Sequence, residues 1–146
     1  DYFYVAYPVQ NNTTMSGDGT TVSGVDFSGG AVPLACKGKT NKLTLYPCCA
    51  VIKSSTYDRL TFPEGCESGM ILAKGDIDVA NNVLRGDEEF DYYGGEMSAI
   101  SDSEGNNYFV IPMANGVVNV KISFGWDDAV TSHAVELRAG YMYTVD

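Results

Sequence analysis

Apolar and polar residues alternate most regularly near the end of the chain. The apolar positions are Val118, Val120, Ile122 and Phe124, and the residues between them are Asn119, Lys121 and Ser123. A period of two places alternate side chains on opposite faces of a β-strand. The pattern therefore predicts a strand over Val117–Phe124, with its apolar set buried together and Lys121 and Ser123 exposed.

Short apolar runs of the same kind recur along the whole chain, and turn-forming residues separate them. The other predicted strands are Tyr2–Tyr7, Thr21–Phe27, Lys42–Tyr46, Ala50–Lys53, Arg59–Phe62, Met70–Ala73, Asp76–Val79, Tyr108–Ile111, His133–Leu137 and Tyr141–Val145. Gly125-Trp126-Asp127-Asp128 interrupts the alternation in the way a hairpin turn does. Many short strands at such intervals favour a sandwich or a barrel. We expect a single all-β domain over residues 1–146, built as an antiparallel β-sandwich.

Composition and charge exclude some classes of function. Hydrophobic residues make up 45% of the 146 residues, which is enough for one core. The formal net charge of −10 and the sequence pI near 4.3 argue against binding to nucleic acid or to anionic membranes. The sequence contains neither an apolar run of 18 residues nor a signal-peptide pattern. Because the chain opens on strand-like residues, we expect a processed chain or an excised domain of a longer precursor.

The first chemical candidates are four cysteines, Cys36, Cys48, Cys49 and Cys66. Their spacing contains no C-x-x-C pair, so it fits a structural zinc site poorly. Four cysteines allow three disulfide connectivities, and the sequence does not choose among them. In a strand, the side chains of Cys48 and Cys49 would face opposite ways. We therefore expect at most one disulfide, with buried free thiols as the alternative.

Catalytic candidates are weak. His133 is the only histidine, it falls within a predicted strand, and no G-x-S-x-G nucleophile motif is present. The acidic groups at Asp102 to Asn107 and elsewhere resemble solvated turns. That segment differs from a calcium loop because its sixth residue is not glycine and its twelfth, Met113, is not glutamate. We therefore predict that the chain is not an enzyme, and we assign no catalytic residue, metal or cofactor.

Trp126 is the only tryptophan, and it allows two interpretations. It extends the apolar alternation of Val118 to Phe124 by one step, which favours a place at the end of the core. Flanked by Asp127 and Asp128, it would also suit a sugar-binding platform, with the ring stacking on a sugar and the carboxylates accepting its hydroxyls.

Three groups of residues carry a resemblance to a known family. The first is Phe3-Tyr4-Val5-Ala6-Tyr7-Pro8, and the second extends from Leu43 to Asp78. The last joins Tyr108-Phe109-Val110-Ile111-Pro112 and an alternating strand to Leu137-Arg138-Ala139-Gly140-Tyr141-Met142-Tyr143-Thr144-Val145. Together they resemble the fimbrillin-like superfamily of Bacteroidales cell-surface proteins. The chain departs from that pattern in its four cysteines and in Pro47-Cys48-Cys49, which interrupts a central strand. Gly140 allows a turn or bulge before the final strand.

The resemblance implies a Greek-key, transthyretin-like sandwich and a structural or adhesive subunit of a fimbria on the extracellular bacterial surface. The partners would be other subunits, joined by β-strand addition at a sheet edge, and we expect both terminal strands to lie at that edge. The alternative is a carbohydrate-binding module that uses Trp126, Asp127 and Asp128, and a hydrolase is a third hypothesis. Neither nucleic-acid binding nor membrane insertion is expected.

Overall fold

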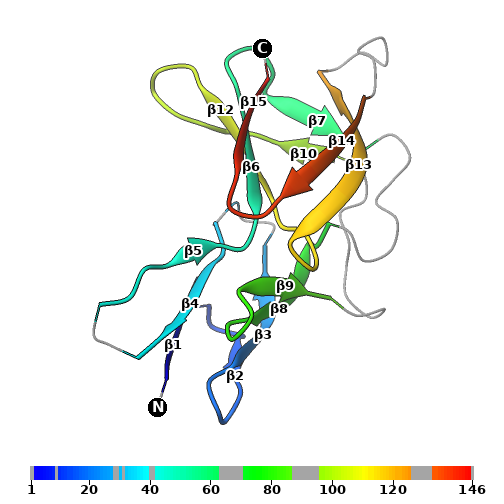
Figure 1. Cartoon of the computed structure of the whole chain (residues 1–146). Coiled ribbons are helices and arrows are strands. Elements are labelled where there is room, and N and C mark those ends of the chain that lie inside the picture. The colour runs from blue at the N-terminus through cyan, green and yellow to red at the C-terminus, as the bar shows by residue number, and fades with distance from the viewer. Residues whose placement is uncertain are drawn as a thin grey trace.

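The structure is a computed structural model, and it describes residues 2–8, 10–27, 30, 32–39, 42–62, 71–86, 96–125 and 133–145. Every regular element within these ranges is a β-strand, as Figure 1 shows. The prediction of an all-β chain is therefore confirmed. No helix in this part of the chain is long and apolar enough to cross a bilayer.

The strands form four small sheets. The β1 sheet contains β1 (Phe3–Tyr7), β4 (Leu34–Gly38) and β5 (Tyr46–Pro47), in that order. The β3 sheet has the order β2 (Thr14–Met15), β3 (Thr21–Asp26), β8 (Lys74–Asp78) and β9 (Val83–Arg85). The β6 sheet has the order β11 (Ile100–Ser101), β12 (Asn107–Ile111), β6 (Ala50–Ser54) and β15 (Met142–Val145). The β13 sheet has the order β10 (Glu96–Ser98), β7 (Arg59–Thr61), β13 (Val117–Phe124) and β14 (His133–Arg138).

This architecture corrects the predicted fold class. The four sheets form a β-propeller-like ring, so the antiparallel, Greek-key, transthyretin-like β-sandwich predicted from the sequence is wrong. The strands pair into four separate sheets of three or four strands each, not into two large facing sheets. One pairing is also not antiparallel, because β15 runs parallel to β6, with Met142 beside Val51.

The buried side chains form two hydrophobic clusters. The first cluster contains Ala50, Ile52, Leu60, Phe62, Ile71, Met97, Phe109, Ile111, Met113, Val118, Val120, Ile122 and Leu137. The second cluster contains Val22, Val25, Phe27, Ala35, Cys48, Leu72, Ile77, Val79, Leu84 and Ala114. The strand members of the first cluster come from the β6 and β13 sheets, and those of the second come from the β1 and β3 sheets. The ring is thus divided into two halves, which occupy the upper and lower parts of Figure 1.

Two short segments join the halves. Ile71 bridges Met113, and the Leu72 N–H donates to the Pro112 carbonyl at 2.8 Å. Alternate side chains of extended segments point opposite ways. Ile71 and Met113 accordingly enter the first cluster, while Leu72 and Ala114 enter the second. Within the predicted strand Met70–Ala73, only Ile71 and Leu72 form bridges to another segment. Met70 lies outside the described residues.

The alternating strand is largely as predicted. β13 has the predicted bounds, and Val118, Val120 and Ile122 are buried in the first cluster with Phe124 packed half-buried against them. Lys121 is exposed, but Ser123 is buried, which the alternation alone did not predict. Ser123 lies in the part of β13 that pairs with β7, opposite Thr61.

The other predicted strands divide into two groups. Those that correspond to β1, β3, β6, β7, β8, β12, β14 and β15 are confirmed, with small differences in their bounds. Lys42–Tyr46 is wrong, because only Tyr46 belongs to a strand. β2, β4, β9, β10 and β11 were not predicted. β4 has two adjacent buried residues, Ala35 and Cys36, instead of an alternating pattern, so periodicity could not reveal it.

Candidate functional site

The edges of the sheets offer the clearest candidate site. An edge strand presents unpaired backbone N–H and C=O groups, and soluble proteins protect such edges by shortness, charge or proline. Four sheets have eight edge strands, and six of those described here are protected. β2, β5 and β11 are two residues long, and β5 includes Pro47. β9, β10 and β14 carry Arg85, Glu96, and Glu136 with Arg138.

The edge strands β1 and β15 have none of these protections. Their sequences, Phe-Tyr-Val-Ala-Tyr and Met-Tyr-Thr-Val, contain no charge and no proline. Within the described residues, β1 pairs only with β4 and β15 only with β6. Large apolar side chains are exposed at both strands. At β1 the exposed fractions are 48% for Tyr2, 58% for Phe3 and 48% for Tyr7, and at β15 they are 62% for Tyr141 and 60% for Met142. These two strands are open edges.

The two faces of β1 differ. Tyr4 and Ala6 pack against the second cluster, so they anchor the strand. Phe3, Val5 and Tyr7 lie on the opposite face, beside Gly38, Cys36 and Leu34 of β4 in the antiparallel register. Phe3 and Tyr7 are exposed on this face, whereas Val5 is half-buried beside the buried Cys36, so the face carries a row of apolar side chains next to an open edge.

β15 is fixed by the turn that precedes it. Gly140 has a φ of 88°, a conformation that suits glycine, and its N–H donates to the Cys49 carbonyl at 2.8 Å. The predicted turn at Gly140 is thus confirmed. Tyr143 packs against the first cluster, and its hydroxyl accepts a hydrogen bond from the Arg138 N–H at 3.0 Å. Met142 lies on the other face, beside Val51.

The two open edges belong to different sheets. β1 borders the β1 sheet in the lower half of Figure 1, and β15 borders the β6 sheet in the upper half. The expectation that both terminal strands lie at one sheet edge is therefore wrong. It failed because β15 pairs with β6, whereas β1 pairs with β4, and the two strands pack on different clusters.

Two lysines lie beside the open edge of β1. Lys37 pairs with Tyr4 in the register of β1 and β4. The Nζ atoms of Lys37 and Lys39 lie 5.3 Å and 4.9 Å from the centroid of the Tyr2 ring, within the range of a cation–π interaction. Tyr2 also contacts Tyr4, with ring centroids 6.4 Å apart. Two cations are thus held over the ring of Tyr2, the residue that precedes β1.

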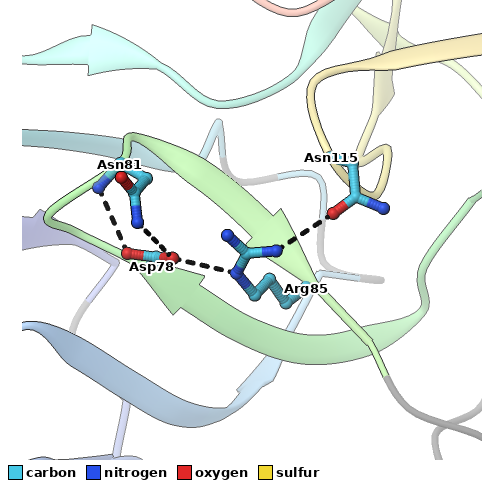
Figure 2. A network of polar contacts seen from close by, with 4 residues as sticks. All are labelled: Asp78, Asn81, Arg85 and Asn115. Atoms are coloured by element: carbon cyan, nitrogen blue, oxygen red, sulfur yellow. Dashed lines mark hydrogen bonds and ion pairs between the residues drawn. The ribbon is translucent and has the colours of Figure 1, made fainter.

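A polar network links the two halves, as Figure 2 shows. The carboxylate of Asp78 accepts hydrogen bonds from the Asn81 N–H at 3.1 Å and from Arg85 Nε at 2.9 Å. Arg85 also donates to Asn115 Oδ1 at 3.2 Å. Partial burial opposes the charged form of Asp78, but these hydrogen bonds outweigh it and lower the pKa. Each of these four residues has a partner inside the network, so we interpret it as structural.

The loop that resembles a calcium site is a closed turn. Asp102 accepts hydrogen bonds from the N–H groups of Glu104 and Asn106, both at 2.9 Å, and from the Tyr108 hydroxyl at 3.3 Å. The bonds from Asn106 lower the pKa of Asp102 most. The interpretation of this segment as a solvated turn is confirmed. No group of three potential metal-ligating side chains is found among the described residues.

The vicinal cysteines lie between β5 and β6 instead of within a strand. Both side chains are buried. The expected opposite orientation assumed that the pair lies within a strand, and that placement is wrong, because residues 48 and 49 form a bend. Cys36, Cys48 and Cys49 are free thiols. Burial raises the pKa of Cys48 and of Cys49 from 9.0 to about 12. Such protonated thiols are poor nucleophiles and poor metal ligands.

The structure leaves several predicted residues undescribed. Trp126, Asp127, Asp128 and Cys66 lie outside the described ranges, as do the acidic residues at positions 87 to 91. The pairing of β13 with β14 confirms that the chain reverses between Phe124 and His133. His133 begins β14, which agrees with its interpretation as a strand residue.

Sequence reasoning missed the lysines beside β1. Lys37 and Lys39 belong to or adjoin β4, which has no periodic signal, so their position over Tyr2 depends on a register that the sequence does not display. One signal was present, however, because residues 27–57 contain four lysines and no carboxylate in a chain of net charge −10.

Comparison with known proteins adds no assignment to this site. No family model, no curated protein and no solved structure matches the chain.

Proposed function

We propose that this chain is a structural or adhesive subunit of a bacterial surface fimbria, and that it joins other chains by β-strand addition. One observation carries the proposal: β1 and β15 are uncharged edge strands with exposed apolar side chains, whereas the other six described edges are protected. Exposed apolar edges are sites where another strand pairs. The resemblance to fimbrillin-like proteins supports the extracellular, surface-attached setting.

The energetics allow such an interaction if the edge is preformed. A strand of about five residues adds several backbone hydrogen bonds, each contributing about 0.5–1.5 kcal/mol. Burial of apolar surface adds about 25 cal/mol per Å². Association itself costs on the order of 4–15 kcal/mol, so an edge that must first be ordered would bind weakly. Tyr4 and Ala6 anchor β1 on the second cluster, and Tyr143 and Val145 anchor β15 on the first, so both edges are held in place.

The placement of the two edges supports a filament more than a closed dimer. β1 and β15 lie on different sheets in different halves of the molecule. Contacts through two different surfaces generate open chains when the rotation between copies does not close a ring. The proposed function requires no catalytic residue and no cofactor.

Peptide binding tests the proposal. Fluorescein-labelled strand peptides are titrated with the full chain, and each is compared with a copy that is N-methylated at alternate residues. Methylation on the edge-facing side removes the backbone donors and leaves the side chains intact. Strand addition predicts that one methylated copy fails to bind while the copy methylated on the other side still binds. Equal binding by both copies would overturn it.

A glycan array tests the alternative in parallel. The carbohydrate-binding hypothesis rests on Trp126, Asp127 and Asp128, which lie outside the described residues. If no strand peptide binds and a glycan binds in a manner that Trp126→Ala abolishes, carbohydrate binding should replace the fimbrial proposal.

A further inference from the structure

We propose that the open edge of β1 selects an acidic, extended polypeptide segment in which carboxylates and apolar side chains alternate. This inference rests on the proposed function, because it names the chemistry of the strand that one of the two open edges accepts. Its carboxylates would lie on the face of Tyr2 and Tyr4, and its apolar side chains on the face of Phe3, Val5 and Tyr7.

The position of the lysine ammonium groups is the first step of the argument. Lys37 and Lys39 extend from β4 and the residue after it, yet both Nζ atoms lie within 5.3 Å of the centroid of the Tyr2 ring, which precedes β1. An added strand would run about 4.8 Å beyond β1. A carboxylate beside Tyr2, on that face of the added strand, would therefore come within reach of both ammonium groups.

The charge around this edge is the second step. β4 and β5 carry no carboxylate, because the sequence between Phe27 and Tyr57 contains no aspartate or glutamate, although the whole chain carries 19 acidic residues. Among the described residues, no ion pair involves Lys37 or Lys39. A strand that brings carboxylates supplies the counter-charges that this sheet lacks, whereas a basic strand is repelled.

The opposite face is the third step. Phe3 is 58% exposed and lies beside Gly38. The Leu43 side chain covers Gly38 so closely that a Cβ atom built on this glycine would lie 2.4 Å from Leu43 Cδ2. Val5 and Tyr7 continue the row along the strand. An added strand would place every second side chain next to this row. Apolar residues are favoured there, so the two faces together specify an alternating acidic and apolar sequence.

Fluorescence anisotropy tests the inference with three eight-residue peptides that alternate valine with glutamate, threonine or lysine. Two exposed ion pairs predict that the glutamate peptide binds about fivefold more tightly than the threonine peptide. The preference should vanish in the Lys37→Gln/Lys39→Gln variant and at 1 M salt, where the Debye length is about 3 Å. It should persist in the control variant Lys74→Gln/Lys121→Gln, which loses the same charge from two exposed strand positions on other sheets.

The outcomes separate this inference from the proposed function. Equal binding of the glutamate and threonine peptides would overturn the acidic preference and leave strand addition standing. If no peptide binds, the proposed function fails as well. Binding of dextran sulfate in place of all three peptides, lost in Lys37→Gln/Lys39→Gln, would show that the lysines recognise an anionic polysaccharide and would overturn the inference.

Discussion

The two hydrophobic clusters are built in different ways. Of the thirteen buried residues of the first cluster, three (Phe62, Ile71 and Met113) lie outside strands. Of the ten buried residues of the second cluster, five (Phe27, Cys48, Leu72, Val79 and Ala114) lie outside strands. The first cluster is therefore mostly a product of strand alternation, while half of the second comes from bends and connections.

The difference shows where long-range contacts determine the fold. A strand interior buries alternate residues by its own geometry, so its contribution follows from local sequence. A residue in a bend is buried only if distant segments cover it. Cys48 depends in this way on Pro33, whose carbonyl accepts its N–H at 2.7 Å, and on Asn82, whose Oδ1 lies 3.5 Å from its Sγ. The second cluster should therefore be the more sensitive to changes at its margins.

The largest expected effect concerns the thiol reactivity of Cys48, which belongs to the second cluster, and of its neighbour Cys49. In a Cys36→Ala/Cys66→Ala background, Cys48 and Cys49 should react with a disulfide reagent about a thousandfold more slowly in the native chain than in denaturant. The reason is that burial raises the pKa of both thiols from 9.0 to about 12, which lowers the thiolate fraction by that factor. Absorbance of the released thiol measures both rates.

The same measurement can contradict the burial of these two thiols. Native rates within tenfold of the denatured rates would show that the bend between β5 and β6 opens readily. The unsubstituted chain in denaturant should give at least three reactive thiols, since Cys36, Cys48 and Cys49 are free. A lower count would contradict the structure.

The next largest effect is the loss of stability when one buried phenylalanine of each cluster is truncated. Phe109 and Phe27 are 0% and 1% exposed, so Phe109→Ala and Phe27→Ala should each lower the free energy of unfolding by about 3–5 kcal/mol. Urea unfolding, followed by far-UV and near-UV circular dichroism, measures the change. Because Ile71–Leu72 and Met113–Ala114 each contribute to both clusters, we expect one common transition.

Phe124→Ala is the matched control for this pair. Phe124 is only half-buried against the first cluster, so its truncation should cost about half as much, roughly 1.5–2.5 kcal/mol. Two separate transitions in the Phe27→Ala variant would show instead that the two clusters fold independently.

The first cluster and its strands could largely be predicted from the sequence. The alternation at Val118, Val120 and Ile122 specified both β13 and its buried face, because that signal is local. Gly140 likewise specified the turn before β15. The division into four sheets could not be predicted in this way, because strand order depends on which distant segments pair.

The candidate site shows the same limit. Phe3 and Met142 could be assigned to strands from local sequence, but not to edges, since an edge is defined by the strand that is missing beside it. The parallel pairing of β15 with β6 connects residues about ninety positions apart, and no short-range pattern reports it. The lysines over Tyr2 became visible only with the register of β1 and β4.

A smaller effect concerns the contact between the halves at Asn115. Asn115 has a φ of 60°, and its side chain accepts a hydrogen bond from Arg85 at 3.2 Å. Asn115→Ala should lower the free energy of unfolding by about 1–2 kcal/mol, because a left-handed conformation is costly for alanine. Asn115→Gly removes the hydrogen bond but suits the conformation, so the difference between the two variants isolates the backbone cost. Equal losses in chemical unfolding would show that the hydrogen bond, not the backbone, dominates.

The smallest effect is a pH dependence that both halves should share. Asp18, in the turn between β2 and β3, accepts hydrogen bonds from the Ser16 hydroxyl at 2.7 Å and from the Thr20 hydroxyl at 2.8 Å. These bonds lower the pKa of Asp18 from 3.8 to about 2. Asp102 has a lowered pKa for the same reason in the turn between β11 and β12.

A lowered carboxyl pKa stabilises the folded state above the unfolded value near 3.8, and the contribution is lost as the pH falls through the folded value. Asp18→Asn and Asp102→Asn should therefore each be slightly less stable than the unsubstituted chain above pH 4. The Asp18→Asn curve should converge with that of the unsubstituted chain as the pH approaches about 2, and the Asp102→Asn curve should converge as the pH falls below the unfolded value near 3.8. Urea midpoints measured across this range test the sign. Glu104→Gln is the control, because it removes a carboxylate from the same turn while its backbone N–H still donates to Asp102. If Asp18→Asn converges and Asp102→Asn does not, the two halves differ in their turns as well as in their cores.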